Sequence, residues 1–372
     1  MERCLTFNLT HFIHSLQKAV EKCSEYDLIP HLDGEDHQYL IVSGSAFAIC
    51  KCTSTAIFSK YKSAAEPIAY DLVNSLLLLA PNTTTFWNYK RTALLNHEVS
   101  INSEMKFTQL ILSKFPRSNE TIFHRQWIIE NFNYIENYDF LLYELKVCNK
   151  IADKYRCHYG LWQYRRFILH QLKPKNYTIE LNHMDDWLSQ HPTDVSGWSY
   201  LASILEGLVN HCIVEPSSSS TVSLLSSDNQ LQWKDVKEIL QNYFNKMHNI
   251  LELYPERECV WMFRRQLITL WLRLNSFGTD HTHNIDVLLS EVEPLLPRIH
   301  DILIKLKVSN QLLKGLSFNE FLNWSYKNDI CCKESSSSSS SLKWIDLLYL
   351  RYLFWLSEYV SEMISFQSVL PK

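Results

Sequence analysis

Hydrophobic residues between positions 66 and 275 recur with the period of an α-helix, and prolines interrupt them at intervals. Before four of these prolines, apolar residues occur four and five positions back, as in Leu76–Leu77 and Ile111–Leu112. Because proline lacks an N–H group and pushes the preceding residue out of the helical region, each should end a helix. The four are Pro81, Pro116, Pro192 and Pro255, and Arg156 occupies the same place in a fifth segment.

A second helix is predicted after each of these positions, built around a bulky apolar anchor. Four residues before the anchor there is often a residue suited to cap that helix, such as Thr83, Ser118 or Asp194. More apolar residues follow six and seven positions beyond the anchor. Because positions i and i+7 share one helix face, the anchor should point into the core. The anchors are Trp87, Ile122, Trp162, Trp198 and Trp261.

The two predicted helices form a unit that repeats along the chain. The first four anchors are 35 to 40 residues apart, and the last interval is 63 residues. Such periods are typical of solenoids of helical hairpins. We therefore expect an all-α fold, an α-α superhelix of five hairpins at 66–275 with a serine-rich insertion at 215–230. Residues 1–65 should form a helix and an extension, and 276–372 a helical region with a serine-rich linker at 331–341 and a capping apolar segment.

The composition supports this fold and excludes several functions. Only 7 of the 372 residues are glycine, too few for the tight turns of sandwiches, Rossmann domains or phosphate loops. The net charge of −4 gives no general reason to bind nucleic acid. No apolar run approaches the roughly 18 residues of a membrane span. We expect a cytoplasmic protein without a transmembrane segment, whose scattered cysteines are reduced thiols.

Basic residues three and four positions after the anchor make the repeat more specific than a generic helical hairpin. They are Lys90 and Arg91, Arg165 and Arg166, and Arg264 and Arg265, with Arg125 followed by Gln126 in the second unit. The arrangement resembles the W-x-x-R-R repeat of protein prenyltransferase α subunits, above all that of the type III geranylgeranyltransferase. The fourth unit departs from it, because Leu201 and Ala202 occupy the basic positions.

This resemblance implies a division of labour between two subunits. In the family, a crescent of α-subunit hairpins wraps a β subunit shaped as an α/α barrel. No cofactor is then expected in this chain, whereas zinc and geranylgeranyl diphosphate are expected in a β subunit of the Rab geranylgeranyltransferase type. The chain is implied to be the non-catalytic α subunit of a heterodimer that transfers a geranylgeranyl group to a C-terminal cysteine of an acceptor protein.

The resemblance also implies two side chains that assist at the diphosphate. By position in the family motif, these are the cation of Arg117, five residues before the second anchor, and the hydroxyl of Tyr159. Fixed cations and hydroxyl donors stabilise the negative charge that develops on a leaving diphosphate. The next residue in the family is a histidine, which is Gly160 here, and His158 is the candidate to replace it.

The chain shows no complete catalytic or metal-binding motif of its own. There is no H-E-x-x-H; His281 and His283 are interpreted as loop residues. The pair Asp185–Asp186 lacks the third carboxylate of a magnesium motif and is interpreted as a solvated helix face. The anchors are expected in the core, and most of the basic repeat residues are expected to pair with a carboxylate or carbonyl of a neighbouring hairpin.

Two other functions fit a helical-repeat chain. A stand-alone scaffold that binds peptides or proteins would have the same concave helical surface, but it would not need an obligate apolar interface with an α/α barrel. A helical-repeat RNA reader would need a basic groove, and the acidic charge balance argues against it. The specificity of the repeat motif favours the prenyltransferase subunit.

Overall fold

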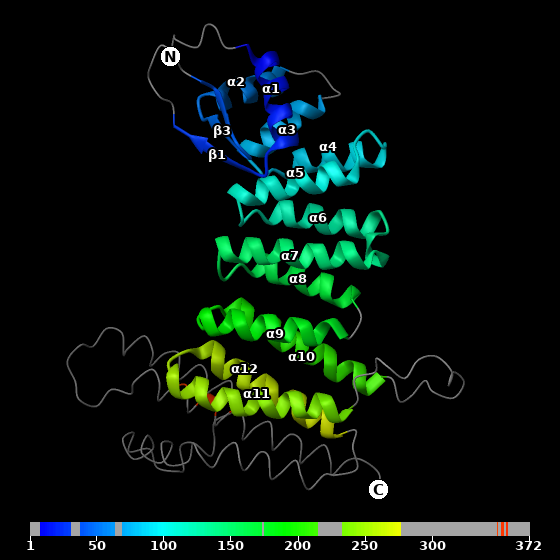
Figure 1. Ribbon diagram of the computed structural model, residues 1–372, viewed down its shortest axis with the longest axis vertical. Helices are drawn as coiled ribbons and strands as arrows, with labels where there is room; N and C mark the ends of the chain where they lie inside the picture. Colours follow the sequence, from blue (N-terminus) through cyan, green and yellow to red (C-terminus); the bar gives the residue numbers. More distant parts are fainter. Residues whose placement is uncertain are drawn as a thin grey trace, which may run out of the picture. The chain divides into compact units, whose positions relative to one another are not determined.

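The computed structural model describes residues 8–30, 38–63, 69–172, 175–214 and 233–276, together with Leu348, Arg351, Tyr352 and Trp355. The chain forms two compact units, Met1–Lys173 and Pro174–Lys372. Figure 1 labels the helices and strands of the described residues. The serine-rich segments 215–230 and 331–341 and the residues His281 and His283 lie outside the described residues.

Five helical hairpins make up most of the described chain, which confirms the predicted hairpin fold. The first helix of each hairpin ends two residues before the proline, or before Arg156 in the third. The pairs are α3 (Tyr70–Leu79) with α4 (Thr84–Leu95), α5 (Ile101–Lys114) with α6 (Asn119–Asn131), α7 (Tyr138–Lys154) with α8 (Tyr159–Gln171), α9 (Lys175–Gln190) with α10 (Val195–Val214), and α11 (Trp233–Leu253) with α12 (Glu258–Ser276).

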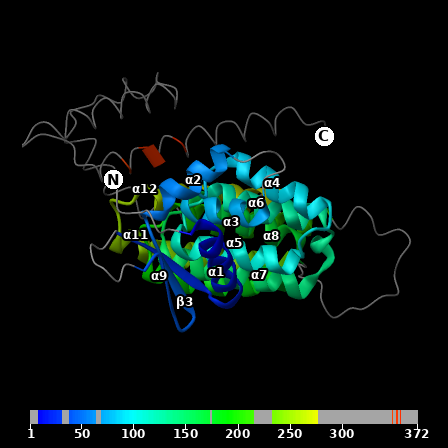
Figure 2. The same cartoon turned by 90° about the horizontal axis from the view of Figure 1, so that it is seen from above.

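Within the unit Met1–Lys173 the hairpins stack in two layers. The second helices α4, α6 and α8 contact one another in sequence, and the first helices α5 and α7 lie beside each other in the other layer (Figure 2). A short 3-10 helix at Tyr134–Glu136 joins α6 to α7. Equivalent positions of successive repeats are therefore neighbours in space, which is why a periodic sequence can build a continuous core in this unit.

The N-terminal residues contain a small sheet that the helical patterns did not reveal. Helix α1 (Leu9–Lys22) is followed by strands β1 (Glu25–Ile29), β2 (Leu40–Ser43) and β3 (Ala46–Cys50), and then by α2 (Thr53–Ser63). The strand order is β1-β3-β2, with β1 parallel and β2 antiparallel to β3. A tight turn at Gly44, whose φ is 58°, joins β2 to β3. The sheet adds to the helical fold without replacing it.

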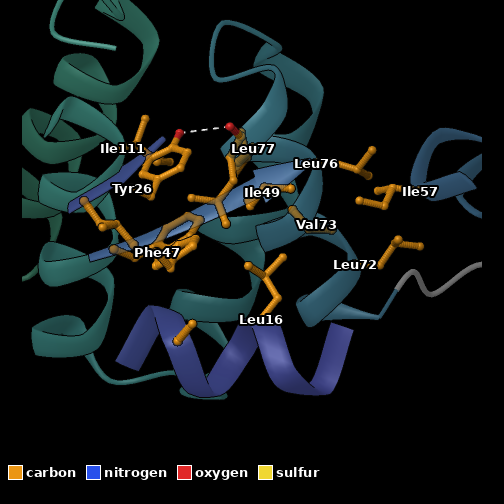
Figure 3. Packing of buried hydrophobic residues seen from close by; sticks show 14 of the residues in the cluster. Leu16, Tyr26, Phe47, Ile49, Ile57, Leu72, Val73, Leu76, Leu77 and Ile111 are labelled. Carbon is orange, nitrogen blue, oxygen red and sulfur yellow. Dashed lines mark hydrogen bonds between the residues drawn. The ribbon is translucent and has the colours of Figure 1, made fainter. Parts of the chain in front are cut away.

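One hydrophobic cluster joins this sheet to the first hairpins. Leu16 of α1, Phe47 and Ile49 of β3, Leu76 of α3 and Ile111 of α5 are all buried in it (Figure 3). The buried Tyr26 hydroxyl donates a hydrogen bond of 2.9 Å to the backbone oxygen of Leu78 at the end of α3. The N-terminal region and the first repeats therefore share a core.

Tryptophan anchors join the two helices of a hairpin through the turn between them. The indole N–H of Trp87 donates to the carbonyl of Pro81 at 2.7 Å, that of Trp198 to Pro192 at 3.0 Å, and that of Trp261 to Pro255 at 2.9 Å. The spacing of six residues between proline and tryptophan in the sequence thus corresponds to a hydrogen bond. All five anchors, Trp87, Ile122, Trp162, Trp198 and Trp261, are buried.

Side-chain caps form at two of the three positions that were expected to cap. The Ser118 hydroxyl accepts the N–H of Thr121 at the start of α6, and the Asp194 carboxylate accepts the N–H of Gly197 at the start of α10. Thr83 precedes α4 at the cap position, but its side chain makes no capping hydrogen bond, so the expected cap is wrong there. Its backbone φ of −95° and ψ of 99° still give the chain the extended entry that a helix start requires.

The described residues near the C-terminus pack on the last hairpin of their unit. Leu348 and Tyr352 are buried, and the Tyr352 ring lies 5.4 Å from the ring of the anchor Trp261. The guanidinium of Arg264 lies 5.4 Å above the Tyr352 ring. These contacts are of the kind expected of an apolar capping segment.

We predict that Trp87→Phe destabilises the unit Met1–Lys173 because it removes the 2.7 Å indole hydrogen bond and leaves the buried Pro81 carbonyl only a 3.4 Å bond from the Ser118 hydroxyl. The expected cost is about 1–3 kcal/mol, whereas Trp87→Ala should cost about 3–5 kcal/mol because it also opens a cavity. Urea denaturation followed by tryptophan fluorescence and circular dichroism would measure both. Leu95→Ala, at an exposed position of the same helix, is the matched control and should change stability by less than about 0.5 kcal/mol. Equal stability of Trp87→Phe and this control would contradict the role of the indole hydrogen bond.

Candidate functional site

The basic residue three positions after the first anchor is fully buried and forms an ion pair. Lys90 on α4 lies 2.7 Å from a carboxylate oxygen of Glu104 on α5, and both side chains have no exposed surface. The other oxygen of Glu104 lies 3.0 Å from Nε2 of His124 on α6. Lys90 also donates to Asn74 at 2.6 Å and to the Tyr70 hydroxyl, both on α3. Glu104 thereby connects the first hairpin to the second.

The same arrangement recurs one repeat later, with arginine in place of lysine. Arg125 on α6 forms a bidentate pair with Glu144 on α7, with N–O distances of 2.6 to 3.1 Å. The remaining guanidinium nitrogen donates to the Met105 carbonyl at 2.7 Å and the Thr108 hydroxyl at 2.6 Å. The Tyr164 hydroxyl donates to Glu144 at 2.7 Å. This buried charge is therefore both paired and hydrogen-bonded, which is the condition for tolerating it in a core.

A carboxylate in the first helix of a hairpin is thus a repeated feature. Glu104, Glu144 and Glu180 each bind a side chain 20 residues later on the second helix of the same hairpin: His124, Tyr164 and Tyr200. In the hairpin of α11 and α12, the equivalent pair is Tyr243 and Phe263, whose rings meet edge to face at 6.1 Å. The hairpin before it carries Leu201 where the others carry a cation. Leu201 thus replaces the cation of one hairpin, and Tyr243 replaces the carboxylate of the next, so both members of the ion pair are absent together.

The other basic repeat residues also have local structural contacts. Arg165 is buried and donates to Asn149 and to the Leu145 carbonyl, both on α7 of its own hairpin. Arg91 lies 5.6 Å from the Trp127 ring, and Arg265 lies 5.8 Å from the Trp355 ring. Arg264 is buried, and Arg166 is half-buried on α8. Lys90 and Arg125 thus pair with a carboxylate of the next hairpin, whereas Arg165 binds within its own hairpin and Arg91 and Arg265 lie against aromatic rings.

Burial and pairing together determine the charge of the Lys90–Glu104 pair. Desolvation raises the pKa of Glu104, but the charge of Lys90 and the hydrogen bond with His124 outweigh it and lower the pKa to about 2. Desolvation lowers the pKa of Lys90 to about 8, against the opposing effect of Glu104. Both groups are therefore ionised at neutral pH. Burial lowers the pKa of His124, so its ring is neutral there.

The three residues implied to assist at a diphosphate lie together at one end of α8. Arg117 is exposed in the turn before α6, with its guanidinium 4.7 Å from the Tyr155 ring. Tyr159 is the first residue of α8, and 66% of its surface is exposed. Arg117 lies close enough to His158 to lower its pKa. The turn before α6 thus presents a cation to solvent, and the start of α8 presents a phenol beside N–H groups that favour anions.

His158 differs from the other two because it is buried and has a structural task. It is the N-cap of α8, and its Nδ1 accepts the N–H of Leu161 at 3.4 Å. Burial lowers the pKa of His158, Arg117 lowers it further, and the carbonyl of Pro116 opposes both. A neutral ring with an acceptor Nδ1 is what this cap requires. Of the three residues, Arg117 and Tyr159 therefore face solvent, whereas His158 supports the start of α8.

Gly160 is a position where the backbone and its neighbours come close together. A Cβ atom at Gly160 would lie 2.4 Å from Oδ1 of Asn119 and 3.2 Å from the His158 ring. Any larger residue would have to displace these side chains. The surroundings of Gly160 thus suit a glycine at the second position of α8, and the histidine implied there by the resemblance would not fit without rearrangement.

The described residues hold no further candidate for metal chemistry. In ranges 8–30, 38–63, 69–172, 175–214 and 233–276, no three His, Cys, Asp or Glu side chains lie together so that they could hold a metal ion. Asp185 binds the Tyr243 hydroxyl at 3.0 Å and the Lys246 ammonium.

Among the residues that the structure describes, no helix combines the length and apolar character needed to cross a membrane.

Comparison with known proteins identifies the repeat. A family model of the protein prenyltransferase alpha subunit repeat matches residues 141–172, most of the α7–α8 hairpin. The protein prenyltransferase alpha subunit repeat-containing protein 1 of Homo sapiens is 26% identical over 240 residues, covering 55% of this chain and 60% of that relative. Its counterpart in Danio rerio is 27% identical over 234 residues, covering 54% of each chain. The matched part thus spans little more than half the length of these relatives.

Geranylgeranyl transferase subunits match the chain as well. The geranylgeranyl transferase type-2 subunit alpha of Dictyostelium discoideum is 26% identical over 256 residues, covering 60% of this chain and 78% of that relative. Together these matches confirm the predicted resemblance. The chain carries a protein prenyltransferase alpha subunit repeat and is similar to prenyltransferase α subunits.

We predict that Glu144→Leu costs about 3–5 kcal/mol of stability, because it leaves the buried Arg125 without its counter-charge. The double variant Arg125→Leu/Glu144→Leu should recover most of that loss, since it removes the buried cation together with the carboxylate. Urea denaturation of both variants and of the single Arg125→Leu gives the coupling energy. If the double variant loses as much stability as the two single variants lose in sum, the pairing is contradicted.

We also predict an acid-sensitive contribution from Glu104. Its pKa of about 2 in the folded chain lies below the ordinary value of 4.5. The ionised carboxylate therefore stabilises the fold fully above pH 4.5, and this contribution is lost as the pH falls toward 2. The stability difference between wild type and Glu104→Gln should narrow over that range when melting temperatures are compared. A difference that is independent of pH would rule out an ionised Glu104 in the fold.

Proposed function

We propose that this chain is the non-catalytic α subunit of a heterodimeric protein geranylgeranyltransferase of the type III kind. The observation that carries the proposal is the repeat of anchor and basic residue, one copy of which, residues 141–172, matches the prenyltransferase alpha subunit repeat model. In the two hairpins before it, the basic residue pairs with a carboxylate of the next hairpin. The similarity to geranylgeranyl transferase type-2 α subunits supports the lipid class. The partner would be a β subunit of the Rab geranylgeranyltransferase type, and the acceptor a protein with a C-terminal cysteine.

Exposed side chains of the second helices support a protein interface in the unit Met1–Lys173. Helices α4, α6 and α8 pack side by side and leave Leu95, Phe123 and Tyr159 between 52% and 66% exposed. Apolar and aromatic residues of this kind are typical of interface cores. The ion pairs, by contrast, are buried between the two layers and are not free to bind a partner. We therefore assign the partner interface to the exposed faces of α4, α6 and α8.

Arg117 and Tyr159 would act at the edge of this interface. In the proposed complex, the β subunit supplies zinc and the geranylgeranyl diphosphate. The guanidinium of Arg117 would compensate the charge of the departing diphosphate, and the Tyr159 hydroxyl would donate a hydrogen bond to it. Both side chains are exposed in this chain, so both are accessible to a partner. His158 would act indirectly, by fixing the start of α8 and hence the direction of Tyr159.

The alternative is a stand-alone helical-repeat scaffold for protein interactions. It shares the hairpins and the exposed aromatic residues, but it needs no diphosphate ligand and no α/α-barrel partner. Co-purification separates the two functions: the chain is expressed with a Rab-type prenyltransferase β subunit, and geranylgeranyl transfer is assayed with each chain alone and with the pair. Activity only in a one-to-one complex supports the α subunit. A folded monomer that ignores every prenyltransferase β subunit favours the scaffold.

We predict that Phe123→Asp abolishes this co-purification, because it places a charge in the centre of the assigned interface. Tyr143→Asp is the matched control: Tyr143 is 49% exposed, close to the 52% of Phe123, but it lies on α7 in the other layer. It should leave the complex intact. Loss of the complex in both variants, or in neither, would contradict the assigned face.

We predict that Arg117→Ala slows geranylgeranyl transfer by roughly 10–1000-fold, as expected when a group that stabilises developing charge is removed, while assembly persists. Arg117→Lys should recover part of the rate because it restores the cation. Lys150→Ala removes an exposed cation from a different element, α7, and should leave the rate unchanged. Turnover by Arg117→Ala equal to that of Lys150→Ala would remove Arg117 from the diphosphate site.

A further inference from the structure

The sulfur atoms of Cys50 and Cys52 are brought together where the N-terminal sheet meets helix α2. Cys50 is the last residue of β3, and Cys52 directly precedes Thr53, the first residue of α2. Their Sγ atoms are 2.7 Å apart, closer than van der Waals contact and near the roughly 2 Å of a disulfide bond. Neither cysteine forms a disulfide bond in this structure. No part of the proposed prenyltransferase role uses them.

The backbone around the pair fixes this approach. The Cys50 N–H donates to the Tyr39 carbonyl at 3.0 Å, and the Lys51 N–H donates to the Ile29 carbonyl at 2.9 Å, so the end of β3 is tied to the sheet. The Thr53 hydroxyl donates to the Cys50 carbonyl at 2.8 Å, which closes the turn into α2. The Cys52 N–H points at the Cys50 sulfur at 3.4 Å. A bond between the two sulfur atoms therefore needs little movement of the backbone.

The two thiols differ in exposure, which assigns them different roles. Cys52 is half-buried and lies at the N-terminal end of α2, where backbone N–H groups stabilise negative charge. Cys50 is fully buried. An oxidant from solvent would thus reach Cys52 first, and Cys50 is held next to it as the resolving thiol.

We propose that Cys50 and Cys52 form a reversible redox site that closes to a disulfide on reaction with hydrogen peroxide. The Cys52 thiolate attacks the peroxide, breaks its O–O bond and becomes a sulfenic acid, and the released hydroxide takes up a proton as water. The Cys50 sulfur then attacks the Cys52 sulfur, which forms the S–S bond and releases a second water. Each sulfur is oxidised by one electron, and the two peroxide oxygens take up both electrons. A small dithiol reductant reverses the bond by thiol–disulfide exchange.

Oxidation of the two cysteines would affect the packing of the first repeat. Helix α2 packs against α3, and Ile57 of α2 is buried in the same hydrophobic cluster as Leu76 (Figure 3). A bond between residues 50 and 52 fixes the entry into α2. The redox site therefore lies where the sheet continues into α2, one of the elements that pack against the first repeat.

The test treats the folded full-length chain with hydrogen peroxide, blocks the remaining thiols with N-ethylmaleimide and maps the products by mass spectrometry. We expect an intramolecular disulfide between residues 50 and 52 that dithiothreitol reverses. In Cys50→Ser the disulfide should be lost, and Cys52 should instead be trapped by dimedone as a sulfenic acid. Cys157→Ser removes an exposed thiol elsewhere and should leave the disulfide yield unchanged.

Three results would overturn the proposal. One is dimedone labelling of Cys52 that is as strong in wild type as in Cys50→Ser. Another is pairing of Cys52 with a different cysteine. The third is an equal disulfide yield in the urea-unfolded chain, since the fold would then contribute nothing. If Cys50→Ser does not fold, Cys52→Ser gives a second test: it must abolish the disulfide while the buried Cys50 stays reduced.

Discussion

A buried carboxylate on the first helix of a hairpin is the constraint on which the repeats of Met1–Lys173 depend. Glu104 and Glu144 are each fully buried, and each receives a cation from the preceding hairpin, Lys90 or Arg125. A charge without its partner in a core is costly, so the two hairpins must meet in one register or lose the pair. Apolar packing alone tolerates sliding of helix against helix. The ion pairs therefore give specificity to an interface that hydrophobic residues make stable.

The exception in the other unit supports this interpretation. Where Leu201 replaces the cation, α11 carries Tyr243 at the position of the carboxylate, and Tyr243 packs against Phe263. The chain has thus used two solutions to the same problem: a fully paired polar cluster, or an aromatic contact with no buried charge. A cation without a carboxylate, or a carboxylate without a cation, would leave a buried ion without its partner. The pairs Lys90–Glu104, Arg125–Glu144 and Leu201–Tyr243 all avoid this.

The sequence was sufficient to predict the hairpins because their signals are local. Proline ends one helix, and the tryptophan six residues later donates to that proline's carbonyl. Both residues of this signal therefore lie close together in the sequence. The sheet was not predictable in this way. Its strands have four or five residues, and β1 pairs with β3 across a gap in the sequence that no periodicity marks. The partners of Lys90 and Arg125 were equally non-local: a pattern shows that a basic residue recurs, but only packing shows which carboxylate it meets.

Exposure separates the cations that build the fold from those that remain for chemistry. Lys90, Arg125 and Arg165 belong to the conspicuous repeat motif, yet all three are buried and bound to side chains of this chain. Arg117 lies outside the motif, is exposed, and has its guanidinium against the Tyr155 ring. A leaving diphosphate can be stabilised only by a cation that it can reach. The residues that identify the repeat are therefore not those that would serve the reaction, and the candidate site lies in the turns between helices, where the repeat leaves side chains free to face a partner.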